Sequence, residues 1–262
     1  MRRPQLARWL IAIIAAVALL FLILPVIALV GRAISTQAWN ELPQSGILEA
    51  ILLSFVTTLL TALLTVVFGT PLAYVFARGH FPLRRFLNLL LELPIVLPPA
   101  VAGLALLVTF GRRGVFGDTL VAFGISLPFT TAAVVVAQTF VSAPFYIRSA
   151  QVGFQAVPRE IEDAARVDGA AGLTLFRFVT LPLASRPLAA GLVLSWARAL
   201  GEFGATILFA GSLQGRTQTM PLLIYNILER NINASIWAGV ILIGLAGLAL
   251  LLSQWLRHEE VT

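Results

Sequence analysis

Residues 155–182 read QAVPREIEDAARVDGAAGLTLFRFVTLP and form the largest polar interruption in a chain of apolar runs. Pro158 suits the start of a helix. Gly169 can end that helix, and a second short amphipathic piece is expected over 173–179. Acidic side chains, which a helix dipole favours in the first turns, follow the proline: Glu160, Glu162 and Asp163. The stretch therefore predicts a short helix–turn–helix, with an ordinary amphipathic loop as the plainer interpretation.

The apolar runs around this stretch are long enough to cross a membrane. A hydrocarbon core about 30 Å thick needs about 20 helical residues. No barrel-like alternation is visible, and open strands cannot leave their backbone unpaired in lipid. The sequence therefore predicts an all-α, polytopic membrane protein with one transmembrane domain over 1–262, in which Pro98 and Pro99 bend the third span. The six expected spans are about 9–30, 47–77, 86–110, 128–154, 183–209 and 232–256.

Composition points to the same class and excludes others. Hydrophobic residues make up 59% and charged residues 11%, whereas soluble domains carry about 25% charged residues. There is no Cys, which excludes disulfides and cysteine–metal sites. All 18 basic residues are Arg, so the chain lacks the lysine of a G-x-x-x-x-G-K-[ST] nucleotide-binding loop. Any ATP that drives this protein must be hydrolysed by another chain.

The arginines predict the orientation, because cytoplasmic loops carry an excess of basic residues. With a cytoplasmic N-terminus, most arginines lie inside: Arg2, Arg3, Arg8, Arg78, Arg84, Arg85, Arg148, Arg159, Arg166, Arg177, Arg186 and Arg257. Fewer lie outside: Arg32, Arg112, Arg113, Arg216 and Arg230. We therefore expect a multi-pass membrane protein with both termini cytoplasmic. The net charge of +6 fits this topology and gives no reason to expect a nucleic-acid partner.

The polar stretch also resembles the cytoplasmic loop signature of ABC importer permeases. That signature is Glu-Ala-Ala, three residues, Gly, nine residues, then Ile-x-Leu-Pro. The spacing is intact here, with Asp in place of Glu and Val in place of Ile. The matching residues are Asp163, Ala164, Ala165, Gly169, Val179, Leu181 and Pro182.

This resemblance implies a type I ABC importer permease fold in the cell (inner) membrane. It also implies a homodimer in the membrane lipid with the pathway at its interface. The coupling loop at about 155–182, Glu162 included, would dock on the ATPase. Two ATPase subunits would use ATP and Mg, and an external oxyanion-binding protein would deliver the cargo. The permease itself would bind no cofactor. Transport would proceed by alternating access through rigid-body movement.

Two further stretches resemble the molybdate branch of these importers. One is 93–99 followed by Gly-Arg-Arg-Gly at 111–114, and the other is 199–206 followed by 215–219. The second is shared with sulfate and tungstate permeases. The resemblance covers about 47–256 and implies molybdate import, with tungstate or sulfate/thiosulfate import as alternatives.

Two charges fall inside the fifth expected span. Arg198 and Glu202 are four residues apart, so they would share one helix face. They either form a supporting ion pair or line the dimer pathway and help to gate it, because a nearly neutral pair suits passage better than tight binding. Gly201 and Gly204 allow close helix packing, and the Thr206 hydroxyl could donate to an oxyanion.

The remaining polar candidates lie at the expected outer face or stand alone. Arg216, Thr217 and Gln218 could meet the binding protein or guide the anion, with a solvated loop as the plainer reading. His80 and His258 lack metal-ligand company, so no metal site is expected. No catalytic constellation is visible, which argues against an intramembrane enzyme. The loop signature argues against a channel or secondary carrier.

Overall fold

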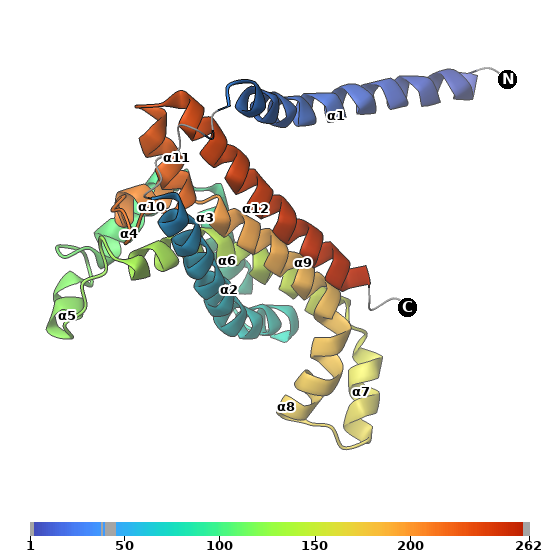
Figure 1. Cartoon of the computed structure of the whole chain (residues 1–262). Coiled ribbons are helices and arrows are strands. Elements are labelled where there is room, and N and C mark those ends of the chain that lie inside the picture. Colours follow the sequence, from blue (N-terminus) through green and yellow to red (C-terminus); the bar gives the residue numbers. More distant parts are fainter. Residues whose placement is uncertain (1–2, 38, 40–45, 259–262) are drawn as a thin grey trace.

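The protein forms a bundle of helices (Figure 1). The computed structural model describes residues 3–37, 39 and 46–258. Helices account for every regular element in these ranges, which confirms the all-α prediction. The long helices are α1 (Arg3–Ser35), α2 (Ile47–Arg78), α6 (Thr131–Ala156), α9 (Leu181–Leu200) and α12 (Ile232–His258). The shorter ones are α3 (Arg84–Val96), α4 (Pro99–Phe110), α5 (Gly117–Ala122), α7 (Arg159–Val167), α8 (Gly172–Leu175), α10 (Gly204–Phe209) and α11 (Met220–Leu228).

Helix α6 is the centre of the bundle and packs along both α2 and α9. Small residues permit this close approach. A β-carbon at Gly69 of α2 would lie 3.0 Å from Ile147, and one at Gly191 of α9 would lie only 2.5 Å from the Ser149 Cβ. The three helices therefore form one tightly packed unit.

A buried stripe of hydroxyl groups follows the face of α2 that meets α6. Its members recur at the spacing of one helix face. They are Ser54, Thr57, Thr58, Thr61 and Thr65. The Thr61 hydroxyl donates to Gln138 Oε1 of α6 over 3.1 Å. Because polar groups in apolar surroundings need partners, the Thr61 bond helps to fix how α2 and α6 face each other, whereas Thr57 and Thr58 bond to carbonyls of α2 itself.

Several helices are suited to a membrane. Three helical segments of the described chain are long and apolar enough to cross one: Arg8–Ser35, Ile47–Arg78 and Gly172–Leu200. The α3–α4 pair makes a fourth if it counts as one bent span. Helix α6 has 26 residues but turns polar side chains such as Gln138 into the bundle. The polytopic prediction is thus confirmed, while the number of six spans stays a prediction.

Two of the expected spans are broken rather than continuous. In place of one helix over 86–110, α3 and α4 meet at 115°. Leu97 and Pro98 are extended, with ψ of 133° and 135°, because a residue before proline disfavours the helical region. In place of one helix over 183–209, α9 ends at Leu200 and α10 starts at Gly204. The bend expected at the prolines is confirmed, but both single-helix assignments were wrong.

Close packing between α6 and α9 gives a test of the fold. Gly191→Leu should destabilise the purified protein, because overpacking a tight contact costs about 1–3 kcal/mol. Gly244→Leu is the matched control, since a β-carbon at Gly244 of α12 would meet no atom within 4 Å. Thermal unfolding in detergent should show a lower Tm for the first variant only. Equal Tm values for the two variants would contradict the packing described here.

Candidate functional site

The polar stretch folds into two short helices at one end of the bundle (Figure 1), called here the loop end. Helix α7 starts after Pro158, as expected. At its other end, the Gly169 N–H bonds to the Arg166 carbonyl at 3.1 Å and the Ala170 N–H to the Ala165 carbonyl at 2.9 Å. This paired termination needs a positive φ after the helix cap, and Gly169 supplies a φ of +93°. The predicted helix end is confirmed.

The second half of the stretch differs from the expectation. Instead of a separate piece over 173–179, α8 runs through a π-helical turn, η2 (Phe176–Thr180), directly into α9. The Leu181 N–H bonds to the Phe176 carbonyl, five residues back. Pro182 has no N–H, so it cannot supply the ordinary bond of the next turn. Leu181 and Pro182 therefore belong to a continuous helix.

Glu162 points into the bundle, although it lies on a short surface helix. It is 3% exposed. Its Oε1 lies 3.0 Å from Nη2 of Arg78, the last residue of α2, and accepts a bond of 2.8 Å from the Thr180 hydroxyl. Arg78 Nη2 also donates to the Val157 carbonyl at 2.9 Å. The carboxylate thus joins the ends of α2 and η2 to α7, and Arg78 adds the residue that follows α6.

The outer face of the loop end has a different character. Asp163 is exposed and forms an ion pair with Arg166, one turn further along α7. Val167 is 87% exposed and Leu173 is 77% exposed. Apolar side chains this exposed on a polar segment are suited to a protein partner. Of the expected coupling residues, Asp163 and Ala164 are thus exposed and Ala165 is half-buried, whereas Glu162 is buried.

The charged pair of the fifth span lies at the break between α9 and α10. Arg198 Nη1 is 2.6 Å from Glu202 Oε2. Glu202 is 1% exposed, and its Oε1 accepts the Ala205 N–H at 2.8 Å. The expected pair is present, but not on one helix face, because Glu202 lies beyond the end of α9. Its carboxylate instead connects the last turn of α9 to the first turn of α10.

The small residues near this pair have different surroundings. A β-carbon at Gly204 would lie 2.6 Å from Pro99 Cβ, so Gly204 lets α10 cross α4 closely. The nearest atom to a β-carbon at Gly201 would be 3.7 Å away, and Gly201 is exposed. Thr206 is fully buried, and its hydroxyl has no hydrogen-bond partner within the described part of the chain. Gly204 therefore serves packing, and an anion would reach Thr206 only if α10 moved.

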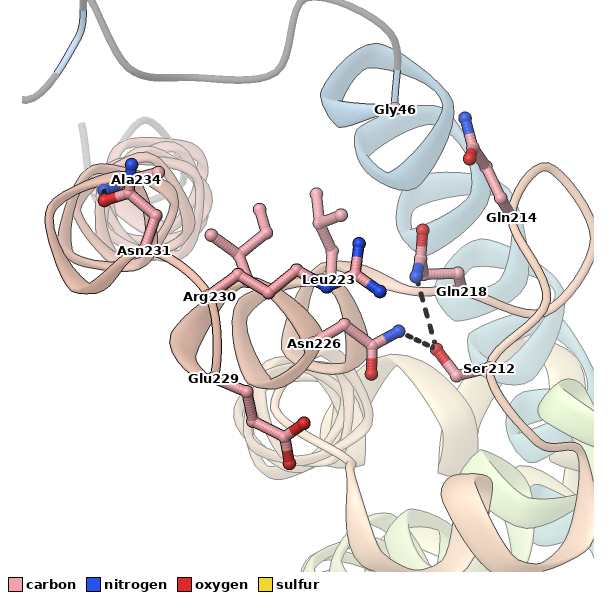
Figure 2. A pocket seen from close by; sticks show the side chains of 11 residues that line it. Gly46, Ser212, Gln214, Gln218, Leu223, Asn226, Glu229, Arg230, Asn231 and Ala234 are labelled. Carbon is pink, nitrogen blue, oxygen red and sulfur yellow. Dashed lines mark hydrogen bonds between the residues drawn. The ribbon is translucent and has the colours of Figure 1, made fainter.

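The loop over 211–219 lies between α10 and α11, at the opposite end of the bundle (Figure 1), and is folded on itself (Figure 2). The Thr217 hydroxyl oxygen accepts the Leu213 N–H at 2.8 Å. Ser212 Oγ accepts from the side-chain amides of Gln218, at 3.3 Å, and Asn226, at 2.9 Å. Beside these groups is a cavity of about 650 Å³. Thr217 and Gln218 thus hold the loop, whereas Arg216 is exposed.

Sequence reasoning missed the partners of these residues. Arg78 was noted only for its place in the topology, Thr180 occupies the variable position of the loop signature, and nothing marked Ser212 or Asn226. No metal-binding cluster of three or more His, Cys, Asp or Glu residues occurs within the described ranges. Some predictions lie outside the described residues: those for Arg2 and for the side chains of Arg3, Arg257 and His258.

Comparison with known proteins decides the family. Residues 69–257 match the family described as the inner membrane component of binding-protein-dependent transport systems. The chain belongs to this family. Family membership confirms a multi-pass inner-membrane transport subunit rather than an enzyme, in a system that uses a binding protein.

Individual transport permeases extend the match. The molybdenum transport system permease protein ModB of Mycobacterium tuberculosis is 41% identical over 247 residues, which cover 94% of this chain and 93% of that protein. The sulfate transport system permease protein CysT of Salmonella typhimurium is 37% identical over 209 residues, 79% of this chain and 76% of that protein.

A solved bacterial ABC transporter involved in the import of the acidic polysaccharide alginate shares the fold. One of its chains aligns with a TM-score of 0.77 at 16% identity, covering 97% of this permease and 96% of that chain. The expected ABC importer permease fold is therefore confirmed.

The Arg198–Glu202 pair of the permease can be tested by a double-mutant cycle. Arg198→Ala leaves the buried Glu202 carboxylate without its cation, which costs about 3–5 kcal/mol, and Glu202→Ala leaves the partly exposed Arg198 guanidinium unpaired at a smaller cost. The double variant should lose much less stability than the sum of the losses in the two single variants. Unfolding free energies in detergent would measure the coupling, and the exposed Asp163–Arg166 pair, expected to couple by about 0–1 kcal/mol, is the control. Additive losses at Arg198 and Glu202 would contradict a direct interaction.

Proposed function

We propose that this chain is the permease subunit of an ATP-driven importer that carries molybdate into the cytoplasm. The observation that supports molybdate most strongly is the 41% identity with ModB over 94% of the chain. The sulfate permease matches over 79%. Sulfate or thiosulfate import is therefore the weaker alternative. Tungstate remains a close alternative, because it is a tetrahedral dianion like molybdate.

The loop end is the proposed docking surface for the ATPase. Its outer face combines the Asp163–Arg166 pair with the exposed apolar side chains of Val167 and Leu173. We place this end in the cytoplasm, together with both termini, because the arginines favour that orientation. A homodimer would present two such surfaces to two ATPase subunits, which would bind ATP and Mg²⁺, while the permease itself would bind no cofactor.

The opposite end is the proposed surface for the external binding protein. The loop over 211–219 is held by internal hydrogen bonds and presents Arg216 at its surface. A guanidinium there can attract the arriving dianion or an acidic patch of the binding protein. Thr217 and Gln218 have a supporting role in this proposal, because their side chains bond within the loop.

The break between α9 and α10 is the proposed gate. Arg198 keeps 30% of its side chain exposed, while Glu202 is buried against it. An anion would thus meet a cation whose charge is already balanced, and this favours passage over tight binding. Because Glu202 also bonds to Ala205, a shift of α10 against α9 would alter the pair. Exposed Gly201, in the link between the helices, leaves room for such a shift.

Uptake measurements test the substrate. Cells that carry the chain should take up labelled molybdate at nanomolar concentration, and cells without it should not. Excess tungstate should compete, whereas excess sulfate should not. If deletion of the chain abolishes sulfate uptake and leaves molybdate uptake intact, the substrate is sulfate. Other molybdate transporters should be deleted from both strains, so that redundancy cannot hide the effect.

A bulky residue at the loop end tests the docking surface. Gly169→Trp should insert normally but lose at least tenfold in uptake, because it strains a φ of +93° and places an indole in open space on the docking face. Gly124→Trp is the matched control: Gly124 has a φ of +73° and equally open surroundings, outside the polar stretch. Uptake and co-purification of the ATPase should be measured together. Normal values for Gly169→Trp would refute the docking assignment.

A further inference from the structure

Helix α7 turns one buried carboxylate into the bundle. It has nine residues, and Glu162 is the buried residue among them. A helix of this length is marginal on its own in water, so its position depends on contacts with the rest of the protein. Exposed Val167 makes little contact with the protein, and Asp163 pairs within α7 itself. The surroundings of Glu162 therefore decide where α7 lies.

Those surroundings join α7 to the ends of three other helical segments. Arg78 is the last residue of α2, Val157 follows the end of α6, and Thr180 ends η2. One guanidinium nitrogen of Arg78 lies within 3.0 Å of both Glu162 Oε1 and the Val157 carbonyl, and the Thr180 hydroxyl completes the cluster. Charge-assisted hydrogen bonds are short and directional, so they fix an orientation more strictly than apolar contact does.

Two of these segments run the length of the bundle. From Thr180, α9 continues to Arg198, 18 residues and about 27 Å away at 1.5 Å per residue. From Arg78, α2 leads back to Ser54, whose hydroxyl oxygen accepts the Met220 N–H at 2.8 Å at the opposite end. A movement imposed on α7 would thus be passed along two long helices, one of which ends at the charged pair.

We propose that Glu162, Arg78 and Thr180 form a latch that transmits the movement of α7 to α2 and α9. The latch stays closed through the transport cycle, so that α7, η2 and the end of α2 move as one rigid body. These three are positioning residues and do not touch the anion. The proposal rests on the proposed function and adds to it the route by which ATPase movement reaches the gate.

The complete transporter, reconstituted with its ATPase and binding protein, tests the latch. Glu162→Gln removes the charge, and Thr180→Val removes one hydrogen bond with little change of shape. The double variant with Arg78→Glu and Glu162→Arg exchanges the two charges and so restores an ion pair between the two positions. Asp118→Asn is the matched control, because Asp118 is an exposed carboxylate on α5, outside the proposed docking surface. ATP hydrolysis and molybdate uptake would be measured on the same vesicles.

The latch predicts loss of coupling without loss of the ATPase. In Glu162→Gln, hydrolysis should stay within about twofold of wild type, while uptake per ATP falls at least fivefold. Thr180→Val should show a smaller loss, the exchanged pair a partial recovery, and Asp118→Asn no change. Unchanged uptake per ATP in Glu162→Gln and Thr180→Val would overturn the proposal. Dissociation of the ATPase would also overturn it, since Glu162 would then support docking rather than transmission.

Hydrogen exchange gives a readout that does not depend on the substrate. In wild type, a non-hydrolysable ATP analogue should change amide exchange both in α7 and at 201–205. In Glu162→Gln the change should remain in α7 and disappear at 201–205. If this difference is seen although the wild-type transporter takes up no molybdate, the substrate assignment is wrong and the latch proposal still holds. An unaltered response at 201–205 in the variant would refute the latch alone.

Discussion

A carboxylate removed from water needs a cation and hydrogen-bond donors, and two buried carboxylates satisfy this need where the long helices are interrupted. Glu162 has Arg78 and the Thr180 hydroxyl, and Glu202 has Arg198 and the Ala205 N–H. Each acid lies in or next to a short helix and is paired with an arginine at the end of a long one. Removing one partner would leave an uncompensated charge, so both interruptions keep a defined geometry.

What the sequence predicted well is what depends on neighbouring residues. The apolar runs located the helices, and Gly169 marked the end of α7 because a positive φ follows from local backbone sterics. The partner of Glu162 was out of reach, since Arg78 is 84 residues away and no local pattern links the two. The break after Leu200 was missed because Gly201 and Gly204 were interpreted as sites of close packing rather than as the end of one helix and the start of the next. Hydroxyl spacing along α2 was a readable signal that remained unused.

The helical frame and the cargo are separable properties. The alginate importer chain shares the helical frame at only 16% identity, so the fold depends on the pattern of packing rather than on particular side chains. Tight glycine contacts between α6 and α9, the crossing of α4 and α10, and the hydroxyl stripe on α2 make up that pattern here. Identity with individual relatives, by contrast, carries the argument about what is transported.

The π-helical turn at Phe176–Thr180 also sets the rotational phase of α9. A turn with one extra residue offsets all later side chains by about 100° around the helix axis relative to an uninterrupted α-helix. Deleting a single residue there would let the helix close its normal ladder, yet it would turn Gly191 of α9 away from Ser149 of α6 while leaving composition and hydropathy almost unchanged. The number of residues in this segment is therefore constrained as strongly as their type. Insertions and deletions among homologues should avoid the segment.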